Sequence, residues 1–280
     1  MIDIGRMNTL TALRETSVGF FLGEPGSENP QDDVLLPNKY VPTSLAVGDE
    51  IEVFIYTDSE DRPIATTLTP HIMRDEFAPL PVVSVTNVGA FLNWGLEKDL
   101  LVPYREQSHP MVVGQWYVVY MYLDEDTGRL VASSKVSRFL DDDVSDLCKG
   151  DEVDLLAYER TDLGYNVIIN DRYQGLLYHS GIFRPIQTGD RMPGFIKHIR
   201  DDKLVDVSLQ QEGFQNIEPN AQRILDELKA NKGFLPLNDH SDPQAIHQAL
   251  EMSKKTFKKA IGVLYKERKI VIQTDGISLV

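Results

Sequence analysis

The chain has 280 residues, of which 42% are hydrophobic and 25% are charged, as in globular proteins with more than one domain. A net charge of −15 excludes a protein that coats nucleic acid without specificity, because binding to phosphates needs a cationic surface. The single cysteine, Cys148, excludes an intrachain disulfide and predicts a cytoplasmic protein. The first ten residues lack a signal-peptide pattern, and no apolar run approaches the length of a membrane span.

The charge is unevenly distributed along the chain. Residues 1–215 carry 18 basic and 35 acidic side chains, whereas residues 216–280 carry 10 basic and 8 acidic ones. The net charges of these two parts are therefore −17 and +2. A cationic surface for a polyanion is expected at the C-terminal end.

Three copies of one strand pattern precede that end. In each copy a glycine opens a short aromatic-rich strand, an apolar strand follows, and a second glycine opens a long alternating strand. The first glycines are Gly19, Gly89 and Gly164, and the second ones follow 29, 25 and 25 residues later. The four additional residues of the first copy fall in the loop-forming stretch 24–30, where an insertion costs little.

Five short strands in each copy predict a small β-barrel of the oligonucleotide-binding type. The three barrels are expected in residues 1–70, 76–140 and 146–212. Acidic clusters at 58–61, 124–126 and 201–202 recur between the last two strands of each copy, and we interpret them as solvated turns and not as metal sites. No metal and no cofactor are expected.

The pattern becomes helical in residues 216–280. Pro219 opens a first helix, Asp242 caps a second and Ser253 caps a third. Two short alternating strands then surround Asp275-Gly276, which is a strong hairpin signal. Three helices followed by a hairpin predict a winged helix. The expected fold is therefore mostly β with an α+β C-terminal module, namely three tandem five-stranded barrels followed by a winged helix.

The third helix is the main candidate for a surface that contacts phosphates. Lys254, Lys255, Lys258 and Lys259 have the spacing of one helix face, opposite the apolar stripe. Basic charge continues toward the hairpin at Lys266, Arg268 and Lys269. The alternative is a solvated face of an amphipathic helix. Lysines position a phosphate backbone and do not read bases.

The three copies resemble S-one RNA-binding domains, and the chain from about residue 8 to 280 resembles the bacterial conserved virulence factor B family. The most specific stretches are Gly233–Pro243 and Met252–Tyr265. This family joins three S-one repeats to a winged helix. The resemblance implies RNA binding and a part in post-transcriptional regulation.

S-one domains usually have an aromatic residue after the glycine of the second strand and a His-x-Ser motif after the third. The third repeat matches best, with Tyr165 and with His179 before Ser180-Gly181, and the second repeat keeps Phe91. We expect Tyr165 on the open barrel face, where aromatic rings stack on bases. The alternative is that Phe91 and Tyr165 are core residues. Basic residues of the third repeat that would hold phosphates are Arg172, Arg184, Lys197, His198 and Arg200.

Three functions remain open at this point. The leading hypothesis is a non-catalytic RNA-binding regulator that uses the third barrel and the third helix, because the chain has no phosphate loop, dinucleotide fingerprint or nucleophile elbow. The first alternative is a DNA-binding transcriptional regulator. The second is an interaction scaffold with a basic partner such as a ribosomal protein. No dimerisation helix is evident, so a monomer is favoured.

Overall fold

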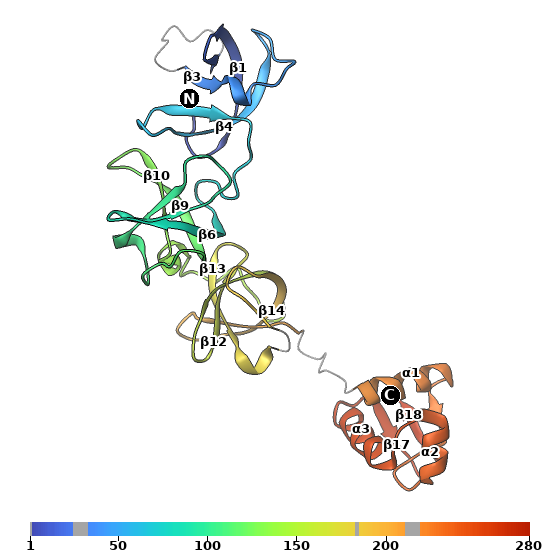
Figure 1. Ribbon diagram of the computed structural model, residues 1–280. Coiled ribbons are helices and arrows are strands. Elements are labelled where there is room, and N and C mark those ends of the chain that lie inside the picture. The colour runs from blue at the N-terminus through green and yellow to red at the C-terminus, as the bar shows by residue number, and fades with distance from the viewer. Residues whose placement is uncertain (1, 25–32, 183–184, 211–218) are drawn as a thin grey trace. The chain divides into compact units, whose positions relative to one another are not determined.

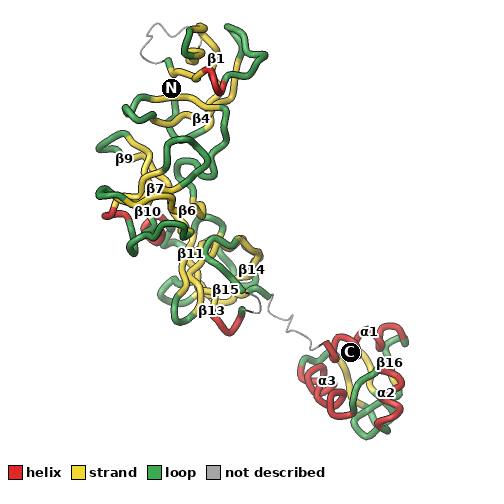
Figure 2. Tube along the Cα trace, viewed as in Figure 1, coloured by secondary structure: helices red, strands yellow, loops and turns green. Residues whose placement is uncertain are grey.

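The computed structural model describes residues 2–24, 33–182, 185–210 and 219–280. The chain divides into two compact units, Met1–Leu209 and Gln210–Val280. Strands dominate the first unit, whereas three helices and a small sheet make up the second (Figures 1 and 2). Residues 25–32, which hold most of the predicted insertion in the first repeat, lie outside the described residues.

Barrel 1 is a closed barrel with the strand order β1-β2-β3-β5-β4. Its core contains alternate residues of these strands, among them Leu22, Leu36 and Ile55. The strands are β1 (Met7–Thr16), β2 (Gly19–Gly23), β3 (Val34–Pro37), β4 (Glu50–Thr57) and β5 (Pro63–Thr66).

Barrel 2 is a five-stranded sheet with the order β10-β9-β6-β7-β8. Its end strands β8 and β10 lie side by side without a ladder of hydrogen bonds, so this copy is curved but open. The strands are β6 (Phe77–Val85), β7 (Gly89–Leu92), β8 (Leu100–Pro103), β9 (Trp116–Asp124) and β10 (Arg129–Ser133).

Barrel 3 is closed and repeats the topology of barrel 1, with the order β11-β12-β13-β15-β14. A Cβ atom at Gly164 would lie 1.9 Å from the carbonyl oxygen of Leu177 on the facing strand, so only glycine permits this approach. The strands are β11 (Glu152–Arg160), β12 (Gly164–Ile169), β13 (Tyr173–Tyr178), β14 (Arg191–Ile199) and β15 (Val205–Ser208).

The three barrels are packed against one another through apolar side chains. Phe54 of barrel 1 belongs to the core of barrel 2, where its ring meets the edge of Trp94 at a centroid distance of 5.7 Å. A second cluster joins Val118 of barrel 2 to Leu156 and Ile168 of barrel 3. These shared cores explain why residues 1–209 form one unit.

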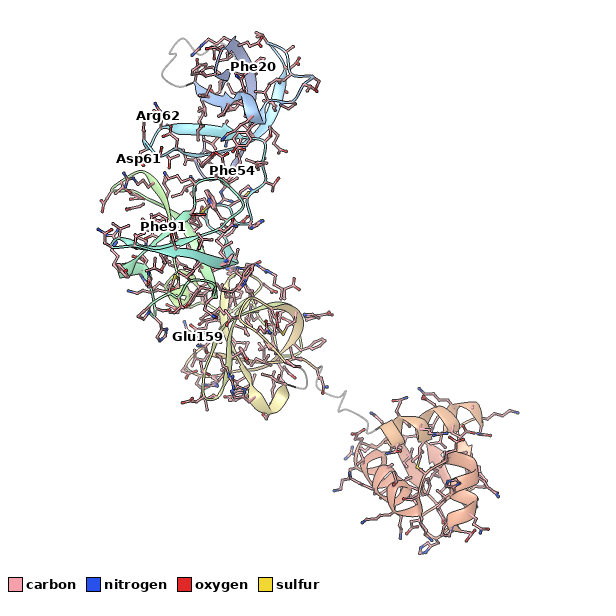
Figure 3. All side chains as sticks on the ribbon, viewed as in Figure 1. Phe20, Phe54, Asp61, Arg62, Phe91 and Glu159 are labelled. Atoms are coloured by element: carbon pink, nitrogen blue, oxygen red, sulfur yellow. The ribbon has the colours of Figure 1, made fainter. Side chains whose placement is uncertain are left out.

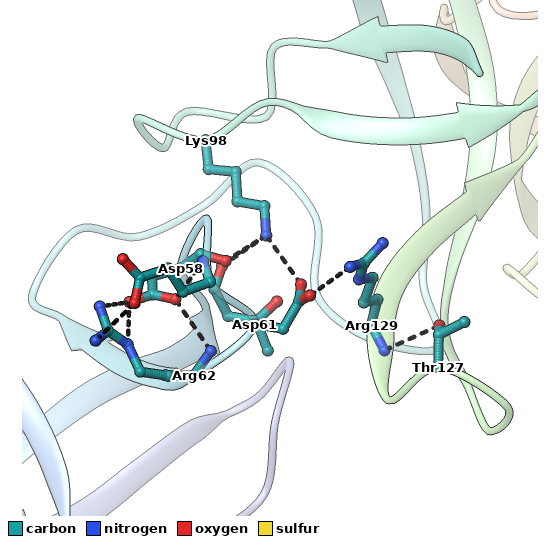
Figure 4. A network of polar contacts seen from close by, with 8 residues as sticks. Asp58, Asp61, Arg62, Lys98, Thr127 and Arg129 are labelled. Atoms are coloured by element: carbon teal, nitrogen blue, oxygen red, sulfur yellow. Dashed lines mark hydrogen bonds and ion pairs between the residues drawn. The ribbon is translucent and has the colours of Figure 1, made fainter.

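A polar network adds to the contact between barrels 1 and 2 (Figure 4). Asp61 accepts a hydrogen bond from Arg129 of β10, and the Lys98 ammonium donates to the backbone carbonyl of Asp58 at 2.6 Å. The hydrogen bond from Arg129 lowers the pKa of Asp61 below its ordinary value of 3.8. The first acidic cluster is therefore a contact between barrels and not only a solvated turn.

The second unit is the predicted winged helix. The Asp242 side chain accepts from the Gln244 amide at 3.1 Å, and the Ser253 hydroxyl accepts from the Thr256 amide at 3.2 Å, so both predicted caps are confirmed. A short strand at Phe234–Leu235 joins the hairpin and was not predicted. The elements are α1 (Pro219–Ala230), β16 (Phe234–Leu235), α2 (Pro243–Leu250), α3 (Lys254–Lys266), β17 (Ile270–Ile272) and β18 (Ile277–Leu279).

The predicted fold class is confirmed in both units. Within the described ranges, no helix combines the length and the apolar character needed to cross a bilayer. The same residues hold no cluster of histidine, cysteine, aspartate or glutamate that could bind a metal ion.

Candidate nucleic-acid interface

The basic face of α3 lies on the side of the helix that does not enter the core. Phe257, Ile261 and Leu264 are buried, which fixes the orientation of the helix. Lys255 and Lys258 are exposed on the other side. The 3.6-residue period therefore sorts the apolar and basic residues of α3 as predicted.

Two lysines of this face, Lys254 and Lys258, are held only weakly by their neighbours. Lys254 Nζ lies 3.3 Å from the carbonyl oxygen of His240, and Lys258 Nζ lies 3.8 Å from Asp239. Lys259 is exposed as well. Exposed contacts of this kind contribute little to stability, so exchanging them for phosphate contacts costs little.

Basic side chains continue beyond the end of α3. Lys266 and Arg268 are exposed, and Lys269 forms an ion pair with Glu267 at 2.9 Å. Glu267 is more enclosed than its partner, so Lys269 compensates its charge. Of these three cations, Lys266 and Arg268 are the better placed for a polyanion.

In barrel 3 the expectation for Tyr165 is wrong. The ring is only 9% exposed and belongs to the barrel core with Val167, and its hydroxyl donates to the Ile186 carbonyl at 2.7 Å. Residues two apart on a strand point to the same face, so a core position for Val167 requires one for Tyr165. Tyr165 therefore offers no free ring face to a base.

His179 lies at the edge of that core. Its exposed ring meets the Tyr165 ring edge-on at a centroid distance of 6.0 Å, and Nε2 lies 3.0 Å from the Thr161 carbonyl oxygen. These two contacts, with the Tyr165 ring and with the Thr161 carbonyl oxygen, hold the imidazole in place at the surface. His179 therefore follows the third strand of the repeat, as the resemblance implied, and its side chain is exposed.

Two further predicted residues are exposed because of a β-bulge. The register of β14 against β15 shifts between Ile196 and His198. A bulge places an additional residue on one strand, so Lys197 and His198 both point outward although they are consecutive. The sequence pattern alone predicts one exposed residue here, because strand side chains alternate.

Two predicted arginines are occupied by carboxylates. Arg172 donates to Asp141 at 2.6 Å and to Asp146 at 3.0 Å, which fastens the segment between barrels 2 and 3. Arg200 donates to Asp206 at 2.6 Å. The geometry assigns both guanidinium groups to internal contacts. Arg184 lies outside the described residues.

Phe91 is half-buried on the outer side of β7 in barrel 2 (Figure 3). It is the second residue after its glycine, whereas Tyr165 is the first, so the two aromatics occupy different positions of the repeat. Asn166 is the structural counterpart of Phe91 in barrel 3. The predicted aromatic residues therefore do not form one surface.

Sequence reasoning missed Trp116, the first residue of β9. Its side chain is 55% exposed, although tryptophan is usually well covered by the protein. The same position, two residues after the second glycine, holds Glu50 in barrel 1 and Arg191 in barrel 3. An aromatic residue where the other copies are charged was the available signal.

Comparison with domain families gives two matches. Residues 4–68, which form barrel 1, match the S1 domain, and residues 222–279 match the CvfB-like winged helix domain. The chain thus combines two types of nucleic-acid-binding domain.

Relatives extend over nearly the whole chain. The uncharacterized protein YitL of Bacillus subtilis is 30% identical, over 97% of this chain and 92% of the relative. Conserved virulence factor B of Staphylococcus aureus strain USA300 is 28% identical, over 84% of this chain and 81% of the relative. A crystal structure of a multidomain protein with nucleic acid binding domains from Streptococcus pneumoniae is 23% identical, with a TM-score of 0.47 and coverage of 99% and 98%.

Proposed function

The chain belongs to the conserved virulence factor B family, and from this premise we propose that it is an RNA-binding protein that regulates gene expression after transcription. It would act in the cytoplasm by binding and not by catalysis. The winged helix would hold the phosphate backbone through α3. The outer face of barrel 3 near His179 and Lys197 would form a second contact.

The basic face of α3 is the observation that carries this proposal. A chain with a net charge of −15 keeps four lysines on the solvent side of one helix, opposite its buried stripe. Phosphate neutralisation supplies most of the affinity of such surfaces. The S1-type barrels favour RNA over duplex DNA, because barrels of this class bind single strands along an open face.

The test is a binding titration at several salt concentrations with single-stranded RNA, matched single-stranded DNA and duplex DNA. The full chain is compared with the variant Lys255→Ala/Lys259→Ala. Each lysine that contacts a phosphate of a single strand contributes about 0.7 to the slope of log K against log salt. We therefore expect RNA preference and a slope that falls by about 1.4 in the variant.

The matched control is Lys229→Ala/Lys232→Ala, which removes the same charge from exposed positions near the end of α1. Its slope should equal that of the parent chain. Preference for duplex DNA would favour a transcriptional regulator. Absence of binding to all three probes would leave a protein-interaction scaffold, for which a basic partner fits the −17 net charge of residues 1–215.

A further inference from the structure

A groove runs along the junction of barrels 2 and 3. It consists of two hollows of about 660 and 470 Å³, and both are lined by Trp116, Arg160 and Thr188. Trp116 and Arg160 therefore stand where the hollows meet, one on each barrel. Glu159, the neighbour of Arg160, lies at this junction in Figure 3.

The walls of the groove are fixed by the packing beneath it. The cluster around Val118 and Leu156 joins the barrels, and the Arg191 guanidinium donates to the Phe77 carbonyl across the junction at 3.2 Å. The two barrels need little rearrangement to keep the groove open. A preformed site avoids the ordering cost that a flexible surface pays on binding.

Trp116 offers a wide aromatic face to this groove. It is 55% exposed, whereas Trp94, the other tryptophan of the chain, is 2% exposed. Exposed aromatic rings in grooves of single-strand-binding proteins stack on bases, because every base has a π face. A nucleobase is therefore an occupant that can stack on the exposed aromatic face of Trp116.

Cations accompany the ring although the unit as a whole is acidic. Arg160 is exposed and has no ion-pair partner among the residues that the structure describes. Lys135 Nζ is held at the groove by the Arg105 carbonyl at 2.6 Å, and this neutral partner does not compensate its charge. Arg138 faces Glu106 at 3.1 Å. The carboxylates of the lining are Glu159 and Asp190.

The remaining lining is rich in neutral polar groups. Amide and hydroxyl side chains such as these donate to and accept from the edges of unpaired bases. An apolar peptide segment would leave them without partners, which is costly at a buried contact. They are Gln115, Ser137, Gln174, Gln187 and Thr188, whereas Ser108, Ser134 and Asn166 of the lining already form hydrogen bonds within the protein.

We propose that the groove between barrels 2 and 3 binds a single-stranded segment of RNA, with one base stacked on Trp116 and a neighbouring phosphate held by Arg160. The proposal rests on the proposed function and adds a site to it. In this proposal barrel 2 contacts RNA directly through Trp116. It also places the stacking ring outside the aromatic positions of the S1-type strands.

The test uses the full chain and a fluorescein-labelled single-stranded RNA of about 12 nucleotides, a length within the range that such barrels cover. Fluorescence anisotropy gives the affinity, and titration with unlabelled RNA follows tryptophan emission. Since Trp94 is buried, quenching reports Trp116. Trp116→Ala should weaken binding roughly 5- to 140-fold, and Trp116→Phe should restore most of it, because stacking contributes that much per base.

Two further variants separate stacking from charge and from general exposure. Arg160→Gln should lower the salt slope by about 0.7. Val112→Ala, which changes a 57% exposed residue outside the groove lining, should leave the affinity unchanged.

The outcomes distinguish the two proposals. Absence of RNA binding by the parent chain would refute the proposed function itself. Binding with unquenched emission, or with Trp116→Ala within twofold of the parent, would refute the groove and leave the function standing. If Trp116→Ala loses RNA affinity and Trp116→Phe does not regain it, Trp116 has a structural role and the groove proposal is overturned. Quenching of tryptophan emission by an apolar peptide and not by RNA would overturn it as well.

Discussion

Gly189→Ala should weaken the junction of barrels 2 and 3, because Gly189 meets two constraints at once. Its φ of +97° lies in the region that favours glycine, and a Cβ atom there would lie 2.7 Å from Cβ of Pro79 in barrel 2. Pro79 is paired with Val118 within its sheet and cannot retreat alone. The substitution therefore forces the two barrels apart.

The two costs can be separated with Gly150→Ala. Gly150 lies two residues before β11 in the same barrel, has a φ of +93° and would place its Cβ atom in open space. Both substitutions should lower the free energy of unfolding by about 1 to 2 kcal/mol, because alanine is strained in the left-handed backbone region. Gly189→Ala should lower it by about 1 to 3 kcal/mol more, because the added methyl group overpacks against Pro79.

Equilibrium urea unfolding of the full chain, followed by circular dichroism, measures this difference. The expected free energy of unfolding is lower for Gly189→Ala than for Gly150→Ala by about 1 to 3 kcal/mol. RNA affinity should fall in the first variant and not in the second if the groove is used. Equal losses of stability would refute the packing argument, because the backbone strain is common to both.

Two other substitutions test contacts described above. Tyr165→Phe should cost about 1 to 2 kcal/mol of unfolding free energy by removing the donor to the Ile186 carbonyl, and RNA affinity should stay within twofold; unchanged stability would mean that the hydroxyl is not buried. The hydrogen bond from Arg129 lowers the pKa of Asp61, so this carboxylate stabilises the fold above its ordinary value of 3.8, and the contribution is lost as pH falls through the lower folded value. Asp61→Asn should therefore lower the urea midpoint at pH 7, and the difference from the parent should narrow progressively as pH falls below 3.8; a difference that stays constant across this range would contradict the reasoning.

Local chemistry made much of the fold predictable. The caps at Asp242 and Ser253 and the hairpin at Asp275-Gly276 depend on residues a few positions apart, and all three are present. The barrels were predictable because one strand pattern occurs in three copies, and the same pattern predicts the same topology. The basic face of α3 followed from helical periodicity alone.

The candidate site was less predictable for two different reasons. Tyr165 was misplaced although the strand period contained the answer, since Tyr165 and Val167 must share a face. The position of Trp116 at a groove depends instead on residues of barrel 3, such as Arg160 and Thr188, that line the same hollows. The ion pair of Asp61 with Arg129 joins residues 68 positions apart, which no local pattern indicates.

The shared cores constrain how this protein can be taken apart. Cutting between barrels 1 and 2 would expose Phe54 and its neighbours, and cutting between barrels 2 and 3 would expose Val118 and Leu156. Such fragments would be prone to aggregation through freshly uncovered apolar surface. Domain-mapping experiments should therefore cut after Leu209, keep the three barrels together, and distinguish them by point substitutions.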